Sequence, residues 1–422
     1  MATLLERAKS ADALVIGGGP AGLAAATRLK RLGLAGVIVA DRELEAGGVP
    51  RHCGHPPFGM REFGRVMTGP KYARRLVKVA KRAGVEFALG HSVVAIERGE
   101  RLVAVCATSD GPVRISAKRI IIATGVRETP RSARLVTGDR PLGILNTGAL
   151  QAYAYLKHLA PFRRPVIAGT ELVALSSLLT CRKIGAQPVA MIEERERPTT
   201  RRPFMALPRL LGVPVRYGTT IADIKGRQRV EAVTLARADG TSEDVECDGV
   251  LFTGRFRPEA SLARAAGLEI DTGTGGPTID QFGRTSDARI FAAGNVLHPV
   301  ETAGWSWQEG VRVADFVGAD LFGWLPSAEN AIRIIAGDGV RYVVPQRFVP
   351  SEGGLPHIQL RASDDISGAL VARSGSEKVH TQTMRTGPER RILAPRNALR
   401  SANADVTFSF DGIQASKPQG GA

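Results

Sequence analysis

The stretch VIGGGPAG at residues 15–22 decides the fold of this chain. It completes an apolar run, residues 13–16, that is typical of a buried parallel strand. In such a stretch Gly17 makes a tight turn, Gly19 lets a pyrophosphate approach the backbone, and Gly22 lets the next helix pack closely on the sheet. The pattern therefore predicts a strand–turn–helix unit with room for a phosphate group at the turn.

The residues that follow complete this pattern. Residues 21–32 are predicted to form a helix that Gly33 ends. A second apolar run, 37–39, leads to Asp41, which lies about 20 residues beyond Gly22, the spacing at which a carboxylate accepts ribose hydroxyls. A glycine-rich turn in an ordinary α/β domain is the alternative. Strand, glycines, helix, second strand and acid in this order favour a dinucleotide-binding unit.

Length and composition limit the class of protein. With 422 residues, 43% of them hydrophobic, the chain is long enough for two or three domains with ordinary cores. No apolar run reaches the ~18 residues of a membrane span, so no span is predicted. Residues 1–12 lack the apolar core of a signal peptide and run into the first strand, which favours a cytoplasmic protein.

The formal net charge is +16, and the basic residues are dispersed apart from a locally basic segment at 71–82. Nucleic-acid binding would need a basic stripe combined with a recognition element, and the sequence shows no such combination. We therefore predict no nucleic-acid partner. A solvated basic surface that attracts anionic substrates, phosphates or an acidic partner fits the composition better.

The four cysteines, Cys53, Cys106, Cys181 and Cys247, are widely scattered and form no C-x-x-C motif. The sequence therefore encodes neither a redox-active dithiol of that type nor a cysteine-rich iron–sulfur site. Cys106 lies in a strand-like run and Cys181 in a helix-like run, so both are expected in the core.

Further units follow along the chain. An amphipathic helix is predicted over 72–83, and a small β meander follows it, with runs at 85–89, 92–97, 101–107 and 112–116. The next elements are an apolar strand, KRIIIATG at 118–125, and a second strand–helix–strand unit that begins at Pro165, with its helix over 171–184. A third apolar strand, ARIFAAGN at 288–295, leads to a helix over 305–322.

Beyond residue 330 the pattern changes. Short alternating runs, such as RYVVPQRF at 341–348, show no helical periodicity and predict a small β-rich domain. The tail ASKPQGGA at 415–422 is predicted to be disordered.

Taken together, the order of dinucleotide unit, meander, A-T-G turn, second dinucleotide-like unit and A-A-G-N return strand is informative. Over residues 12–325 it resembles the FAD-dependent pyridine nucleotide-disulphide oxidoreductase superfamily, the two-dinucleotide-binding-domain flavoproteins. More narrowly, the chain resembles the flavin subunits of opine oxidase, hydrogen cyanide synthase and the sarcosine oxidase alpha chain. It resembles more closely still the FAD-dependent oxidoreductases found beside anaerobic glycerol-3-phosphate dehydrogenases, and the stretches at 47–73, 253–263 and 291–307 resemble the signature of that group.

The resemblance implies an α/β fold with two Rossmann-like dinucleotide-binding domains and a small β-rich carboxyl-terminal domain. Residues 1–127 and 249–330 would form a discontinuous FAD-binding domain. Residues 128–248 would form an NAD(P)-binding-like domain, and residues 331–422 the β-rich domain with its disordered tail.

The resemblance also implies FAD as the cofactor and a set of residues that hold it. The pyrophosphate would lie at the first glycine turn, the adenosine ribose at Asp41 and the adenine near the backbone of Val93. Many relatives end the return strand in Gly-Asp where this chain has Gly294-Asn295, and an amide can still donate or accept a hydrogen bond there. The implied set is Gly17, Gly19, Pro20, Ala21, Gly22, Asp41, Arg42, Gly48, Val93, Ala123, Thr124, Gly125, Gly294, Asn295, Thr302 and Ala303.

The second dinucleotide-like unit departs from the family pattern. Glu171 stands where a glycine should let phosphates touch the backbone, so its side chain would block that approach. Its carboxylate would also occupy the helix terminus that an anion would use, and Glu193 and Glu194 would disfavour a 2′-phosphate. We therefore predict that this domain is degenerate and that electrons enter from an organic substrate rather than from NAD(P)H.

The segment at 51–55, Arg-His-Cys-Gly-His, stands where reductase relatives carry their active dithiol, but one cysteine cannot form that pair. Cys53 is predicted to be a substrate contact, a flavin-tuning thiol or a low-pKa nucleophile, with a buried packing role as the alternative. His52 or His55 is a candidate base that takes a proton while hydride goes to flavin N5. The spacing of these three residues matches no strong zinc pattern, so no metal is predicted.

Other residues near the implied flavin have two interpretations each. Trp305 and Trp307 either line the pocket or pack a helix start, and His298 is a secondary base candidate. Arg127 and Arg131 either clamp an anionic substrate or are solvated.

The sequence thus predicts an FAD-dependent oxidoreductase that oxidises a small polar metabolite, such as an amine, amino acid or hydroxy acid. Its electrons would pass to a partner flavoprotein or electron-transfer subunit. The alternatives are an NAD(P)H-dependent flavin reductase and a non-catalytic FAD-binding electron-transfer subunit of a heteromeric dehydrogenase.

Overall fold

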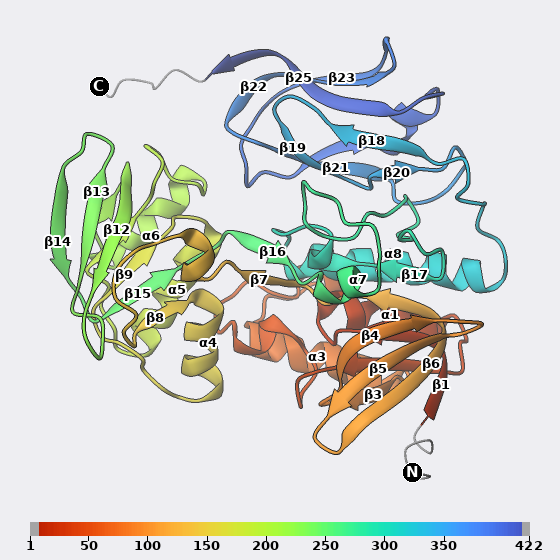
Figure 1. Cartoon of the computed structure of the whole chain (residues 1–422), viewed down its shortest axis with the longest axis horizontal. Coiled ribbons are helices and arrows are strands. Elements are labelled where there is room, and N and C mark those ends of the chain that lie inside the picture. Colours follow the sequence, from red (N-terminus) through yellow and green to blue (C-terminus); the bar gives the residue numbers. More distant parts are fainter. Residues whose placement is uncertain (1–7, 416–422) are drawn as a thin grey trace. The chain divides into compact units, whose positions relative to one another are not determined.

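The computed structural model describes residues 8–415 (Figure 1). The predictions for residues 1–7 and for residues 416–422 of the tail lie outside the described residues, and Ala415, predicted within that tail, ends a strand. The chain forms two compact units: the first comprises residues up to Gly48, Ala73–Val126 and residues from Arg257 on, and the second comprises Val49–Tyr72 and Arg127–Phe256. Within residues 8–415, no helix combines the length and apolarity needed to cross a membrane.

The first unit is built on the sheet that the glycine stretch predicts. Strand β1 (Ala8–Ile16) lies between β2 (Val37–Asp41) and β6 (Gly111–Ile122), and the three run parallel. β3 (Glu86–Leu89) and β17 (Ile290–Ala292) continue this parallel arrangement at its two sides. The carboxyl ends of these strands therefore meet at one edge of the sheet.

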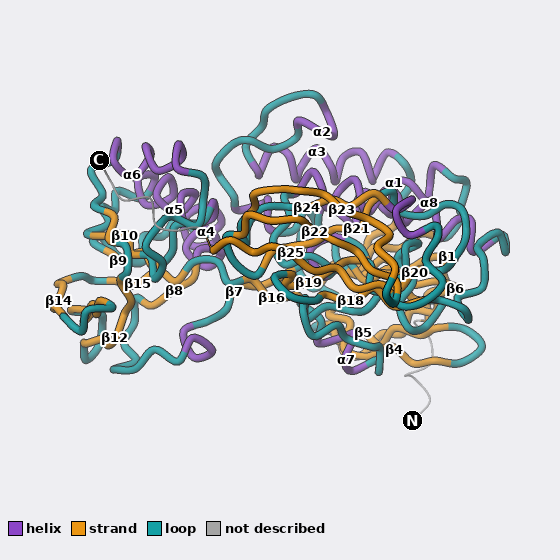
Figure 2. Tube along the Cα trace, turned by 90° about the horizontal axis from the view of Figure 1, so that it is seen from above, coloured by secondary structure: helices purple, strands orange, loops and turns teal. Residues whose placement is uncertain are grey.

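The helices of this unit follow the predicted periodicity. α1 (Pro20–Arg31) follows β1, and Gly33 beyond its end has φ +92°, as a helix-ending glycine requires. α8 (Ala303–Leu321) lies beside α1 (Figure 2). A Cβ on Gly310 would overlap the carbonyl of Ala21, so this glycine permits the close approach of the two helices. α3 spans Gly69–Arg82.

The meander differs from its prediction in one detail. β4 (Ser92–Arg98) and β5 (Leu102–Thr108) pair antiparallel as expected. The runs at 112–116 and 118–122, predicted as separate strands, form the single strand β6. Its register with β1 continues without interruption from Arg114 to Ile122, so no break is required.

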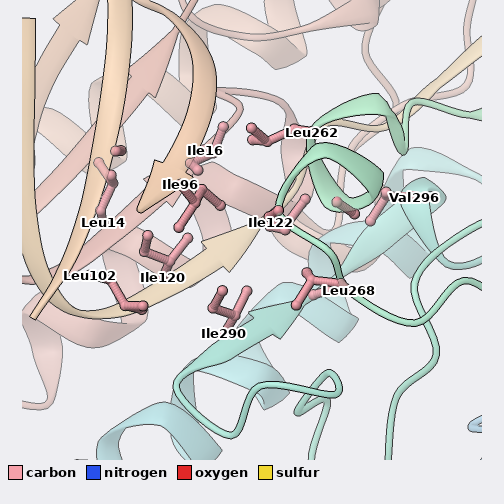
Figure 3. Packing of buried hydrophobic residues seen from close by; sticks show 14 of the residues in the cluster. Leu14, Ile16, Ile96, Leu102, Ile120, Ile122, Leu262, Leu268, Ile290 and Val296 are labelled. Carbon is pink, nitrogen blue, oxygen red and sulfur yellow. The ribbon is translucent and has the colours of Figure 1, made fainter. Parts of the chain in front are cut away.

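A shared apolar core fixes the sheet and the segments that cover it. Side chains from both ends of the chain's first unit meet there, as Figure 3 shows. Leu14 and Ile120 come from the parallel strands, Ile96 from the meander, and Leu262 and Ile290 from residues more than 130 positions later. Burial of this kind stabilises a fold by roughly 1.5–3 kcal/mol for each large aliphatic side chain.

The second unit repeats the strand–turn–helix pattern. Its parallel sheet has the order β11-β10-β9-β15-β8, and α5 follows β9 as predicted. Strands β12, β13 and β14, which lie between β11 and β15 along the chain, form a separate antiparallel sheet. The helix α4 was not predicted; it begins after Asn146, whose side chain accepts a hydrogen bond from the Ala149 amide at 2.8 Å. The bounds are β8 Ile144–Asn146, α4 Thr147–Leu156, β9 Pro165–Ala168, α5 Leu172–Lys183, β10 Ala190–Ile192, β11 Val215–Arg216, β12 Thr219–Lys225, β13 Ala232–Arg237, β14 Ser242–Glu246 and β15 Gly249–Phe252.

Short elements complete the path of the chain. They are α2 Met60–Phe63, β7 Val126–Glu128, α6 Ala206–Leu210, β16 Phe256–Pro258 and α7 Ser261–Ala265.

The residues after 330 form two β-sheets with a shared apolar core, as the alternating runs predict. One sheet has the order β20-β18-β25-β22-β23 and the other β19-β21-β24. These residues belong to the first compact unit, whereas 49–72, predicted within the FAD-binding domain, belong to the second. The bounds are β18 Ile332–Ala336, β19 Val340–Val344, β20 Arg347–Phe348, β21 His357–Ala362, β22 Ile366–Ser374, β23 Glu377–Thr386, β24 Ile392–Pro395 and β25 Val406–Ala415.

Candidate functional site

The first glycine turn has the geometry that a pyrophosphate needs. Gly17 has φ +109°, a conformation that residues other than glycine rarely adopt. A Cβ on Gly22 would overlap the carbonyl oxygen of Gly17, so the helix packs against the turn only with glycine there. A Cβ on Gly19 would meet nothing closer than the Gly48 Cα at 4.0 Å, so the backbone at Gly19 is open to an approaching group.

The amino terminus of α1 favours an anion. Gly19 is its N-cap, Pro20 its first residue, and no described side chain caps it. The first turn of α1 carries no acidic residue. The amide groups of this first turn and the helix dipole therefore leave a positive potential at the turn, which suits a phosphate.

Asp41 and Gly48 border this turn. Asp41 Oδ2 accepts a hydrogen bond from the Gly18 amide at 2.6 Å, and Oδ1 accepts from the Glu43 amide at 2.9 Å. A carboxylate oxygen has two lone pairs, so each can still accept from a ribose hydroxyl. Gly48 has φ +62°, and a Cβ there would lie 2.7 Å from the Gly19 Cα, so only glycine lets the loop lie against the turn.

The A-T-G turn after β6 is held in place by residue 259. Thr124 Oγ1 donates to the Glu259 carbonyl at 2.7 Å, and the Glu259 amide donates to the Gly125 carbonyl at 2.8 Å. The implied FAD residues on β1, β2, β6 and β17 all lie at the carboxyl ends of these parallel strands, where α/β sheets bind their ligands. Val93 is half-buried in β4, and Arg42 is exposed.

The return strand ends in a hydrogen-bonded turn that precedes α8. Gly294 has φ +82° and donates its amide hydrogen to Glu309 Oε2 at 2.7 Å. Asn295 uses its amide in both directions: Nδ2 donates to the Glu301 carbonyl at 3.1 Å, and Oδ1 accepts from Ser306 Oγ at 3.1 Å. Thr302 is the N-cap of α8 and Ala303 its first residue, two positions before the predicted start.

Glu309 is a site residue that the sequence analysis missed. Burial opposes its ionisation most strongly, but His298, the Gly294 amide and the charge of Arg391 together outweigh burial and lower the pKa of Glu309. His298 Nε2 lies 2.9 Å from Glu309 Oε1, and its side chain is 2% exposed. This histidine therefore belongs to a buried hydrogen-bond network, and its role as a secondary base stays a prediction.

The second glycine turn has a different occupant. Gly169 has φ +136°, and the Glu171 Oε2 atom lies 2.5 Å from the position of a Cβ on Gly169. Glu171 Oε1 lies 2.7 Å from the position of a Cβ on Gly254. The carboxylate therefore folds back over the turn and lies beside both Gly169 and Gly254. Glu193 is buried and accepts hydrogen bonds from Thr170 Oγ1 and, at 3.1 Å, Thr199 Oγ1.

Cys53 lies in the second unit and is buried. Its Sγ donates to Gln151 Oε1 at 3.2 Å. Desolvation, and secondarily the charge of Glu128, raise the pKa of the Cys53 thiol to about 12. The low-pKa nucleophile considered for this cysteine is therefore wrong, because burial and a neighbouring negative charge both disfavour a thiolate. Cys106 and Cys181 are fully buried, which confirms their predicted core positions.

The two histidines of the same segment differ in environment. His55 Nδ1 donates to the Pro56 carbonyl at 2.9 Å, and its ring contacts that of Phe58 with 5.4 Å between centroids. Its Nε2 is then the atom that can accept a proton. His52 ends a 3₁₀ turn, Val49–His52, and is half-buried. Among residues 8–415, no three His, Cys, Asp or Glu side chains lie together as metal ligands would.

The arginines after the A-T-G turn have local roles. Arg131 donates to the carbonyls of Val136, Thr137, Gly138 and Asp139, so its guanidinium holds its own loop. This position does not support its predicted role as a clamp for an anionic substrate. Arg127 is exposed.

Two strand–turn–helix units, one with an open glycine turn, define the class: a protein with two dinucleotide-binding domains. A family model described as pyridine nucleotide-disulphide oxidoreductase matches residues 11–314. The chain belongs to this family of oxidoreductases. The residues at the first turn fit FAD, since they combine an open backbone, an uncapped helix terminus and the Asp41 carboxylate beside the turn.

Curated relatives agree with this assignment. Dihydrolipoyl dehydrogenase 3 of Pseudomonas aeruginosa is 31% identical over 59% of this chain and 59% of its own length. The alpha subunit of sarcosine oxidase from Rhizobium meliloti is 30% identical over 60% of this chain and 25% of its own. An opine oxidase subunit of Agrobacterium tumefaciens is 25% identical over 67% and 61%. The chain thus spans less than two thirds of each of these relatives.

A solved structure has the same fold. The thioredoxin reductase of T. acidophilum matches 74% of this chain and 99% of its own, with a TM-score of 0.64 and 21% identity. The predicted α/β fold with two dinucleotide-binding domains is therefore confirmed.

Proposed function

We propose that this chain is the flavin subunit of a dehydrogenase or oxidase that oxidises a small polar metabolite, such as an amine, amino acid or hydroxy acid. Its electrons pass to a partner protein and not to NAD(P). The observation that carries the proposal is the carboxylate of Glu171 over the second glycine turn. A negative charge at that helix terminus repels a pyrophosphate, and the side chain takes up the space a pyrophosphate needs.

The cysteines support direct oxidation of a substrate. A disulphide relay needs two thiols that can form a bond, yet Cys53 forms a hydrogen bond with Gln151, and the other three cysteines are also free and buried. FAD, when bound, supplies the hydride acceptor. His55 is the proposed base, because the hydrogen bond from Nδ1 to the Pro56 carbonyl leaves Nε2 to take the substrate's proton, with His52 as the second candidate.

The names of two relatives support a separate partner subunit that receives the electrons. The matched proteins of sarcosine oxidase and opine oxidase are each one component of an oxidase. By analogy, the partner of this chain is a flavoprotein or another electron-transfer subunit that receives electrons from the reduced FAD.

Anaerobic reduction of the bound flavin tests the proposal. The holoprotein is mixed with a panel of amines, amino acids and hydroxy acids, and separately with NADH and NADPH, and flavin bleaching is followed. The expected result is rapid bleaching by one substrate class and slow bleaching by both nicotinamides. Rapid stoichiometric bleaching by NADH or NADPH, with no response to the panel, would overturn it.

An NAD(P)H-dependent flavin reductase is the second candidate. It is favoured by Gly169, which keeps the turn conformation of a nucleotide site, with φ +136°. Bleaching by NADH would select this function. If neither nicotinamides nor metabolites bleach the isolated chain, and it co-purifies with a dehydrogenase, it is instead a non-catalytic FAD-binding subunit.

A further inference from the structure

The β-rich residues after 330 lie beyond the part of the chain that the family model matches. They nevertheless send three polar side chains toward the turn that follows β17. Gln359 and Arg361 belong to β21, and Arg391 immediately precedes β24. All three belong to the same compact unit as the first glycine turn.

Gln359 connects the β-rich residues to Glu309. Its Nε2 donates to Glu309 Oε1 at 3.3 Å, beside the His298 Nε2 that shares this acceptor. Its Oε1 accepts from the guanidinium of Arg391. The other oxygen of Glu309 accepts from the Gly294 amide, so one buried carboxylate joins Gln359 to the turn that the FAD must contact.

Arg391 acts on the start of α8. Its guanidinium carbon lies 3.8 Å from the centroid of the Trp305 ring, a stacked cation–π contact. Its Nε lies 3.7 Å from Glu301 Oε1, and the Arg361 guanidinium donates to the same oxygen. Since the Glu301 carbonyl accepts from Asn295, these two arginines also fix the amide at the end of the return strand.

The charged side chains of this network are buried, so each of them needs its partners. The side chains of Glu301, Glu309 and Arg361 are each less than 8% exposed. A buried charge that loses one partner is left uncompensated, and the backbone that it holds then rearranges. Apolar contacts alone would be enough to pack the β-rich residues on the rest of the unit. The continuous hydrogen-bond network to Gly294 and Asn295 does more, because it fixes the conformation of the turn after β17.

We propose that Gln359 and Arg391 are positioning residues of the FAD site. Through Glu309 and Trp305 they hold Gly294, Asn295 and the first turn of α8 in the conformation that accepts the flavin. The β-rich domain is therefore part of the cofactor site. This inference depends on FAD as cofactor and is independent of the substrate and of the state of the second nucleotide site.

Four variants of the full chain test the proposal: Gln359→Leu and Arg391→Met, with Gln382→Leu and Arg373→Met as controls. The controls lie in the same β-rich residues; Gln382 is exposed, and Arg373 forms a half-exposed ion pair with Asp411. Each apoprotein is titrated with FAD by flavin fluorescence. Its melting temperature without FAD and the visible spectrum of the bound flavin are also recorded.

The expected result is a loss of FAD affinity of about ten-fold or more in the two test variants, with an altered flavin spectrum. The controls keep the affinity and spectrum of the unmodified chain. Unchanged affinity and spectrum in both test variants would overturn the proposal, even if their apoproteins melt earlier. Arg391→Lys serves if Arg391→Met fails to fold. It keeps the charge but loses the planar stack on Trp305, so its flavin spectrum must shift.

Discussion

Glu171 reaches back to the glycine two positions before it, so that its Oε2 lies 2.5 Å from where a Cβ of Gly169 would be. The side chain of Glu171 therefore lies against the glycine turn of the second unit. In the corresponding turn of the first unit, no atom lies closer than 4.0 Å to the position of a Cβ on Gly19. The backbone at Gly19 is therefore open in the first unit, whereas a carboxylate lies against the corresponding turn of the second.

Replacing Glu171 with glycine is expected to restore nucleotide binding, because it removes both the charge and the side chain from the turn. We expect NADH affinity to increase by about ten-fold or more, measured by calorimetry with the holoprotein. Glu171→Gln removes only the charge and separates the two effects. Asp244→Asn is the control, since Asp244 forms an exposed ion pair with Lys225 in the same unit and away from the turn. Tight NADH binding by the unmodified chain would refute the blocked turn.

Gly22→Ala is expected to destabilise the first unit and to lower FAD content. Alanine normally favours a helix, but here its Cβ would overlap the Gly17 carbonyl oxygen. Overpacking of this kind costs about 1–3 kcal/mol in the free energy of unfolding, measured by urea denaturation. Gly99→Ala is the matched control, because its nearest neighbour lies 3.6 Å from the new Cβ. Equal stability of both variants would contradict the close packing of α1 on the turn.

The thiol of Cys53 gives an alkaline pH dependence. Because its pKa rises from 9.0 to about 12 in the folded protein, the unfolded chain loses this proton first. The contribution of this thiol to the free energy of unfolding is therefore complete below about pH 9. It decreases between pH 9 and 12, by up to about 1.4 kcal/mol per pH unit for one group. Urea unfolding at several pH values should show a smaller slope in Cys53→Ala. A slope that this substitution leaves unchanged would mean that the thiol titrates normally.

The first unit was predictable because its signals are local. The glycines, the apolar strands and Asp41 lie within 30 residues of one another, and their spacing alone specifies the turn. Helix α4 was missed, although Asn146 is a typical N-cap, because the residues after it lack an amphipathic pattern. An N-cap residue without a following amphipathic pattern is weak evidence for a helix.

The polar network around Glu309 could not be predicted in the same way. Glu309 lies on the buried face of α8 with Val313 and Val317, and the partners of its carboxylate come from outside the helix. One of them, Gln359, lies 50 positions later in the chain. Cys53 shows the same limit, since its raised pKa depends on burial beside Gln151, 98 positions away. Glycine geometry is encoded in neighbours along the chain, whereas the ionisation of a buried group is decided by partners that only folding brings together.

Glu309 gives an acid-side prediction. Its pKa is lowered in the folded protein, so its charge stabilises the fold above the ordinary carboxyl pKa of 4.5, and this contribution is lost as the pH falls through the lower folded value. Since its carboxylate holds the Gly294 amide, we expect FAD to be released in the same acid range. Glu309→Gln should release FAD more readily at neutral pH and show a weaker acid dependence, followed by the fluorescence of free flavin. Glu259→Gln, which leaves the backbone hydrogen bonds of residue 259 in place, is the control. Release of FAD from Glu309→Gln at the same pH and with the same steepness as from the unmodified chain would show that this carboxylate does not govern the turn.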